Sequence, residues 1–244
     1  MSGHSKWSKI QHKKGKTDSA RSNLFTKLSR AITIAASQGG GDPEMNFSLR
    51  LAIQKGKEEN LPKDNIERAI KKGTGDLNDG TVLEEVAYEG FGPCGVAFLV
   101  EAVTDNKNRA VSEIKYAFSK FGGSLGGPGS VQWQFERFGV MRLSKENKES
   151  VADKWSDFEL ALMDAGVDDI IDNEFGVELH SPVDNFQKVM EVVNSYNIEM
   201  DDSGLEWIAK ETVSLNKEES DRVEKLYDAL DELDDVRAVY TNEA

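Results

Sequence analysis

The sequence predicts an α+β protein of three domains, with an N-terminal helical domain followed by two small two-layer α/β domains, the third inserted in the second. Three observations predict this fold. Apolar residues recur at helical spacing between glycine and proline breaks up to residue 75, and strand-like runs begin only at Val82. A second set of strand and helix patterns then separates the first sheet from a final helix and strand at 220–240.

The helical domain is predicted to contain three helices. The first runs from Thr17 to the glycines at 39–41, which supply the left-handed geometry of a helix end. Asp42 and Pro43 are expected to begin the second as N-cap and first-turn proline. The third spans about 62–72.

The remaining chain is predicted to form two α/β domains. The domain boundaries we expect are 1–77 for the helical domain, 78–136 plus 214–244 for the middle domain, and 137–213 for the inserted domain. The middle domain is expected to contain strands at 82–91, 96–103, 131–135 and 236–240, helices after Asn106 and at 220–233, and a glycine-rich loop at 122–129. The inserted domain is expected to contain strands at 139–143, 167–171, 175–179 and 207–213, and helices at 151–165 and 183–196.

Composition indicates a soluble globular protein. Hydrophobic residues make up 38% of the chain and charged residues 30%. No apolar run is long enough to span a membrane, and the first 30 residues lack the apolar core of a secretory signal. Cys94 is the only cysteine, so no internal disulfide can form. These features fit a reducing compartment, and we expect a cytoplasmic protein.

Charge is divided unequally along the chain. Residues 1–75 hold 15 Lys/Arg and 7 Asp/Glu, a net charge of 15 − 7 = +8. Residues 76–244 hold 15 Lys/Arg and 37 Asp/Glu, a net charge of 15 − 37 = −22. The first part therefore suits a polyanion. The acidic part would repel nucleic acid or face basic proteins, or it serves only solubility.

The first 30 residues are the strongest functional signal. Cations cluster there with an aromatic residue and two of the three histidines, and the only acid is Asp18. Such a mixture is typical of nucleic-acid contact, with Lys and Arg on phosphates and Trp7 stacking on a base or ribose. A solvated basic terminus is the alternative. The predicted nucleic-acid-binding residues are His4, Lys6, Trp7, Lys9, His12, Lys13, Lys14, Lys16, Arg21, Lys27 and Arg30.

Two polar segments have structural as well as functional interpretations. Asp105, Asn106, Lys107 and Arg109 follow a predicted strand, where they could meet a partner or phosphate, or simply cap the next helix. The pair Asp234–Asp235 is expected to be a solvated helix end.

No residue constellation predicts an enzyme. The glycine-rich loop lacks the Gly-Lys-Ser/Thr ending of a phosphate loop and precedes a strand. Cys94 has no histidine nearby in sequence, and three scattered histidines do not form a zinc pattern. We therefore predict no catalytic residue, no metal and no cofactor.

Short motifs along almost the whole chain identify a resemblance to the YebC-type proteins, a family that is widespread in bacteria and is represented in mitochondria by a translational activator. The matching stretches are Gly3–Trp7, Phe25–Lys27, Gly40–Pro43, Leu49–Arg50, Pro62–Ile66, Ala69–Ile70, Tyr88–Pro93, Thr104–Asn106, Arg109, Gly122–Gly123, Gly129–Val131, Asp234–Val236 and Val239–Asn242. The sequence departs from the family pattern at Cys94, where glycine is usual, and at Lys14 and Lys16, where alanine and glutamine are more frequent.

The resemblance implies a helical domain and two α/β domains, the middle one completed by the chain end. It implies DNA-binding transcriptional regulation for some members, and for others a ribosome-associated role that eases synthesis of sequences such as proline runs. It implies no enzymatic activity.

We therefore expect a monomeric, non-enzymatic regulator of gene expression that binds nucleic acid. A ribosome-associated translation factor that contacts rRNA through its basic domain is the favoured interpretation, and a DNA-binding transcriptional regulator is the alternative. A protein-interaction scaffold with an incidental basic tail is the third.

Overall fold

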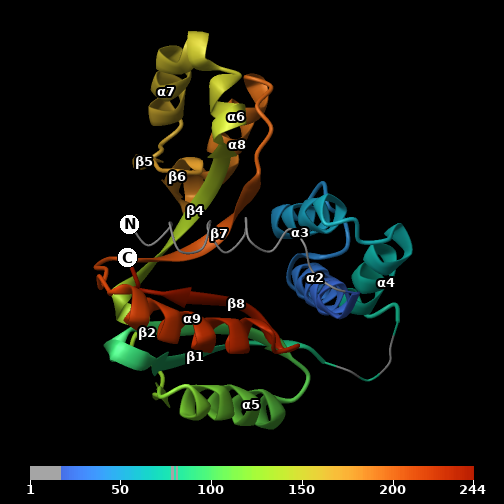
Figure 1. The fold of residues 1–244 in the computed structure, drawn as a ribbon. Coiled ribbons are helices and arrows are strands. Elements are labelled where there is room, and N and C mark those ends of the chain that lie inside the picture. The colour runs from blue at the N-terminus through green and yellow to red at the C-terminus, as the bar shows by residue number, and fades with distance from the viewer. Residues whose placement is uncertain (1–17, 78–79, 81) are drawn as a thin grey trace. The chain divides into compact units, whose positions relative to one another are not determined.

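A computed structural model describes residues 18–77, 80 and 82–244 of the chain (Figure 1). The described residues fall into two compact units, one of 18–133 with 214–243 and one of 134–213 with Ala244. Helices come first, and two four-stranded antiparallel sheets follow, so the α+β class is confirmed. The three predicted domain boundaries stay predictions.

Three helices open the first unit: α2 (Asp18–Gly39), α3 (Phe47–Glu58) and α4 (Lys63–Gly73). Their shared core includes Ile32, Leu49 and Ile66. The α4 helix comes close to α2 at Gly73, where an added Cβ would lie 2.3 Å from the carbonyl oxygen of Thr33. Glycine is therefore required at this crossing.

The α3 helix starts later than predicted. It begins at Phe47, and Asp42 instead accepts a hydrogen bond from the backbone N–H of Glu44 at 2.9 Å in a turn. Asn46 is the cap, because its side-chain oxygen accepts from the N–H of Leu49 at 3.0 Å. The amide of Asn46 also donates to the carbonyl oxygen of Ala35 at 2.7 Å, which fixes the cap against the end of α2.

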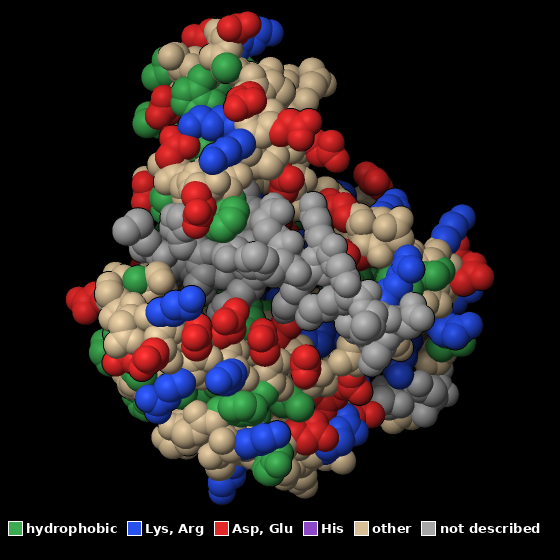
Figure 2. All heavy atoms as spheres, in the orientation of Figure 1, with side chains coloured by type: hydrophobic (Ala, Val, Ile, Leu, Met, Phe, Trp, Pro, Cys, Tyr) green, Lys and Arg blue, Asp and Glu red, His purple; other side chains and the backbone are tan. Residues whose placement is uncertain are grey.

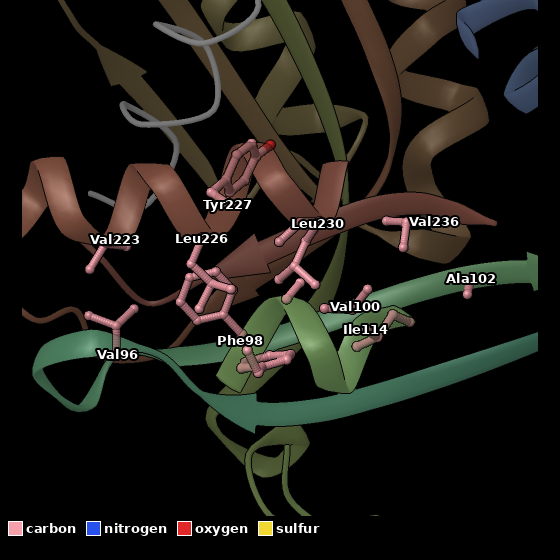
Figure 3. Packing of buried hydrophobic residues seen from close by; sticks show 13 residues of the cluster. Val96, Phe98, Val100, Ala102, Ile114, Val223, Leu226, Tyr227, Leu230 and Val236 are labelled. Carbon is pink, nitrogen blue, oxygen red and sulfur yellow. The ribbon is translucent and has the colours of Figure 1, made fainter. Parts of the chain in front are cut away.

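The first sheet contains strands from both ends of the unit. It comprises β1 (Glu84–Phe91), β2 (Ala97–Thr104), β3 (Ser124–Leu125) and β8 (Val236–Thr241), in the order β3-β1-β2-β8. Helices α5 (Lys107–Lys120) and α9 (Lys217–Asp231) supply the second layer. The core includes Phe98 and Val100 of β2, Ile114 of α5, and Leu226 of α9 (Figure 3). The late helix and strand thus complete this sheet, as the sequence predicted.

The strand expected at 131–135 is absent from this sheet. The third strand is the two-residue β3, while Gln132–Gln134 form a 3-10 turn, η2, and Phe135 begins the second sheet. The cause is the carboxylate of Glu89, whose residue is only 4% exposed. It accepts backbone N–H groups of Gly129, Val131 and Gln132 at 2.6, 2.7 and 2.8 Å. These donors are consequently unavailable to a strand ladder.

The sheet of the second unit has the order β5-β6-β4-β7. In both units a strand, a helix and a second strand follow one another along the chain, and another strand lies between the two in the sheet. In the first unit these are β2, α5 and β3 with β1 between the strands, and in the second they are β4, α7 and β5 with β6 between the strands. The second unit contains β4 (Phe135–Ser144), α6 (Lys145–Glu149), η3 (Ala152–Lys154), α7 (Trp155–Asp164), β5 (Asp169–Asp172), β6 (Gly176–Pro182), η4 (Val183–Asn185), α8 (Phe186–Ser195) and β7 (Asp202–Ala209). The prediction missed α6 and placed β7 too late.

Candidate nucleic-acid interface

Three of the predicted nucleic-acid-binding residues lie within the described part of the chain. Arg21, Lys27 and Arg30 are all on α2. Arg21 is exposed, and its guanidinium carbon lies 5.6 Å from the ring centroid of Phe25. The other predicted residues lie outside the described residues: His4, Lys6, Trp7, Lys9, His12, Lys13, Lys14 and Lys16.

Lys27 contacts the last residue of α9, and Arg30 contacts the turn between α9 and β8. The ammonium of Lys27 donates to the carbonyl oxygen of Asp231. The Nη1 atom of Arg30 donates to the carbonyl oxygen of Asp234 at 2.5 Å and to Oδ1 of Asp235 at 2.7 Å. Carbonyl groups at a helix C-terminus lack helical partners and carry partial negative charge, so cations stabilise them. Two of the three predicted nucleic-acid-binding residues that the structure describes are therefore bound within their own unit.

Asp235 is the centre of this contact. Its side chain is 2% exposed, which contradicts the expectation of a solvated helix end. Arg109 donates to its two oxygens at 2.9 and 2.8 Å through Nη2, and the hydroxyl of Thr104 donates at 2.9 Å. The hydrogen bonds to Asp235 and then to Asp105 raise the pKa of Arg109. The carboxylate therefore joins α2, the end of β2, α5 and the turn before β8.

The segment 105–109 takes part in local structure. Asn106 caps α5 by accepting the N–H of Arg109 at 3.1 Å, as one of the two interpretations predicted. Lys107 pairs with Glu84 at 2.6 Å. The hydrogen bond from Arg109 lowers the pKa of Asp105. The role of these four residues as a partner or phosphate loop stays a prediction.

A cleft of about 470 Å³ lies between α2 and α4. One wall is a row of hydroxyl side chains on α2, and the other carries polar and cationic side chains of α4. Only Arg30 and Asp105 among its lining residues were predicted from sequence. The lining residues are Ser22, Phe25, Thr26, Ser29, Arg30, Thr33, Asn65, Arg68, Ala69, Lys72, Leu83 and Asp105.

The second unit contains a buried ionic network that the sequence did not reveal. Arg142 is fully buried and contacts Glu178 at 2.7 Å, Asp202 at 3.0 Å and Glu206 at 2.9 Å. His180 lies 2.6 Å from Glu178. Burial alone would raise the pKa of Glu178, but the hydrogen bond with His180 and the charge of Arg142 lower it. Three carboxylates therefore surround one buried arginine and satisfy its charge.

The described residues show neither a metal-binding cluster nor a membrane-spanning helix. They contain no group of three or more His, Cys, Asp or Glu side chains placed to hold a metal ion. Within the same part of the chain, no helix has the length and apolarity needed to cross a membrane.

Comparison with known proteins accounts for nearly the whole chain. Residues 5–76 match the model of the TACO1/YebC protein N-terminal domain, and residues 83–243 match that of the TACO1/YebC second and third domain. The chain belongs to the TACO1/YebC family. The resemblance inferred from short motifs is thereby confirmed.

Individual relatives of this TACO1/YebC member are similar over their full length. Proteins of Natranaerobius thermophilus and Thermoanaerobacter pseudethanolicus, each named a probable transcriptional regulatory protein, are 44% and 46% identical over 242 residues. Each match covers 99% of this chain and 96% of the relative. The crystal structure of a conserved hypothetical protein from Aquifex aeolicus is 38% identical, with a TM-score of 0.85 over 96% of this chain and 95% of that one.

Proposed function

We propose that this protein is a nucleic-acid-binding regulator of gene expression that works without catalysis. In its most specific form, it is a ribosome-associated translation factor that binds rRNA through its basic N-terminal domain and eases the synthesis of difficult peptides. The observation that carries the proposal is the charge division, with a net charge of 15 − 7 = +8 for residues 1–75 and 15 − 37 = −22 for the rest. A polyanion is attracted to the first part and repelled by the second.

The acidic side chains are on the surface, where they can act on partners. Figure 2 shows Asp and Glu side chains gathered over α9. The exposed acids of this helix are Glu218, Asp221, Glu224 and Asp228. Such a surface would keep the body of the protein away from phosphate groups or would meet basic proteins, which are abundant where RNA and protein assemble together.

Helix α2 favours backbone contact over the reading of bases. A sequence-specific DNA-binding helix presents a row of Arg, Asn or Gln side chains to base edges. The side of α2 that lines the cleft presents hydroxyl groups instead, Lys27 is bound to the last residue of α9, and Arg30 is bound in the turn before β8. This chemistry suits recognition of shape and phosphate in a folded RNA.

A DNA-binding transcriptional regulator is the second candidate. It is favoured by the names of the relatives, which are described as probable transcriptional regulatory proteins. That function requires a preference for one duplex sequence over another, whereas the translation function requires association with ribosomal particles.

Sedimentation through a sucrose gradient tests the proposal. The wild-type protein is compared in lysate with a variant in which Lys6, Lys9, Lys13, Lys14 and Lys16 are changed to alanine. We expect the wild type to travel with ribosomal particles and the variant to stay at the top, because about five phosphate contacts are lost. A matched control removes five exposed lysines elsewhere, at Lys115, Lys145, Lys188, Lys210 and Lys225.

The control has the same loss of charge and should sediment like the wild type. If the wild type stays at the top but shifts a duplex promoter fragment more than a scrambled one, the transcriptional function replaces the ribosomal one. If it binds neither, both proposals are wrong.

A further inference from the structure

We infer that the cleft between α2 and α4 is a binding site for single-stranded nucleic acid, in addition to the basic segment from Lys6 to Lys16. The inference rests on the proposed function and adds a site to it. The ligand unit is one nucleotide of a strand, with its phosphate on the polar walls and its base on the apolar floor. Three features of the cleft support this assignment.

The first feature is the hydroxyl wall of α2. Ser22, Thr26 and Ser29 follow one another at intervals of four and three residues, which places them on one side of the helix. At a rise of 1.5 Å per residue, the row extends over about 10 Å. Hydroxyl groups are common neutral donors to phosphate and sugar oxygens. The hydroxyl of Thr26 already donates to the carbonyl oxygen of Ser22 at 3.1 Å, so the donors of this row are Ser22 and Ser29. Neutral donors would let a strand bind without requiring a charge at every phosphate.

The second feature is the polar wall of α4. Asn65, Arg68 and Lys72 are spaced by three and four residues and all line the cleft. Arg68 is exposed, and within the described residues it makes no hydrogen bond or ion pair. Its guanidinium group can therefore form two parallel hydrogen bonds with a phosphate. This freedom contrasts with Arg30, which is bound to Asp235 at 2.7 Å.

The third feature is the apolar surface between the walls. Phe25 is half-buried, and it lines the cleft with Ala69 and Leu83. An aromatic ring in such a position gives a base a stacking surface, which contributes roughly 1–3 kcal/mol per base by alanine substitution. The guanidinium of Arg21 lies over the same ring at 5.6 Å and would add positive charge beside the base.

The size and charge of the cleft define the ligand further. A volume of about 470 Å³ is that of a pocket for a small molecule, so a nucleotide enters and a duplex does not. The only acid in the lining is Asp105, whose carboxylate lies 2.7 Å from Arg109. Its negative charge is therefore offset before a phosphate arrives.

Fluorescence anisotropy with the full chain tests the inference. The probes are labelled oligouridine and oligothymidine strands of about fifteen nucleotides and a mixed-sequence duplex of the same length. Arg68→Ala should weaken binding of the single strands about tenfold or more, the effect expected for losing a hydrogen bond to a charged group. It should also reduce the slope of log K against log salt by about one.

Lys71→Ala is the matched control, because it removes the same charge from an exposed neighbouring position of α4 that does not line the cleft. We expect an effect below about threefold. Phe25→Leu keeps apolar volume but removes the ring, so it should weaken single-strand binding and leave duplex binding unchanged. Melting curves of all variants verify folding.

The inference is overturned if Arg68→Ala and Lys71→Ala weaken binding equally, or if Phe25→Leu weakens duplex and single strands alike. These outcomes leave the proposed function intact, since that depends on the basic segment. Failure of the wild type to bind any probe overturns both. Tighter binding of oligouridine would identify RNA as the ligand, and tighter binding of oligothymidine would identify DNA.

Discussion

Replacing Asp235 with alanine should strongly destabilise the first unit. The carboxylate is 2% exposed and receives hydrogen bonds from Arg109, Arg30 and Thr104. The substitution removes the shared acceptor of all three groups. It would also weaken the contact between α2 and the turn before β8, because Arg30 would keep only its bonds to carbonyl oxygens.

The magnitude follows from the exposure of the partners. Breaking a buried ion pair costs about 3–5 kcal/mol when the remaining charge stays buried. The side chains of Arg109 and Arg30 are 41% and 20% exposed, so they regain water and this cost falls to about 2 kcal/mol. Thr104 is 1% exposed, and its hydroxyl loses an acceptor but its oxygen still accepts the N–H of Asn106, so it adds a penalty of about 1 kcal/mol. We expect a loss of about 3 kcal/mol in the free energy of unfolding.

Thermal unfolding followed by calorimetry measures the effect. For a chain of this length, a loss of about 3 kcal/mol lowers Tm by about 6–12 °C. Asp234→Ala is the control, because it removes the same charge from the adjacent exposed residue. It should change stability by no more than about 0.5 kcal/mol. Equal melting temperatures for the two variants would refute the reasoning.

Three further substitutions have defined outcomes. Glu89→Gln should lower the unfolding free energy by about 2 kcal/mol at neutral pH, because an amide cannot replace a carboxylate that accepts three backbone N–H groups. Burial would raise the pKa of Glu89, but those bonds lower it below the unfolded value, so the wild-type advantage in urea titrations should shrink as pH falls below about 4.3. An advantage independent of pH would contradict this assignment. Cys94→Gly should raise the unfolding free energy by about 1 kcal/mol, since Cys94 has a φ of 60°, and an unchanged urea midpoint would show that the turn is unstrained. Arg142→Met should cost about 3–5 kcal/mol by leaving buried carboxylates without their cation, and hydrogen exchange should then accelerate in β4, β6 and β7 but not in α2.

Local patterns in the sequence predicted most helices and strands. The cap at Asn106 and the helix that became α9 depend on residues close together in the chain, and both were placed within a few positions. The predicted start of α3 was wrong because the cap residue Asn46 is held partly by Ala35, which belongs to another helix. The strand expected at 131–135 failed for a similar reason, since the carboxylate of Glu89 is about forty residues away in sequence.

The candidate site was less predictable than the fold. Charge clustering identified Arg21, Lys27 and Arg30 as cations of α2, but it could not show that Lys27 bonds to the end of α9 and Arg30 to the turn before β8. The hydroxyl row of the cleft was present in the sequence as a helical repeat. Its significance depended on Arg68, which α4 places opposite that row.

The pairing of β2 with β8 has a consequence for synthesis of the chain. The ladder pairs Phe98 with Thr241, so β2 lacks one neighbour until the residues of β8 have left the ribosome. The second unit, at 134–213, is complete earlier and can fold first. Until then, the apolar residues of β2 that pack on α9 stay uncovered. A nascent chain that has released residues up to 213 but not β8 would therefore carry a complete second unit and an open first sheet, which makes this stage a period of exposure to chaperones and proteases.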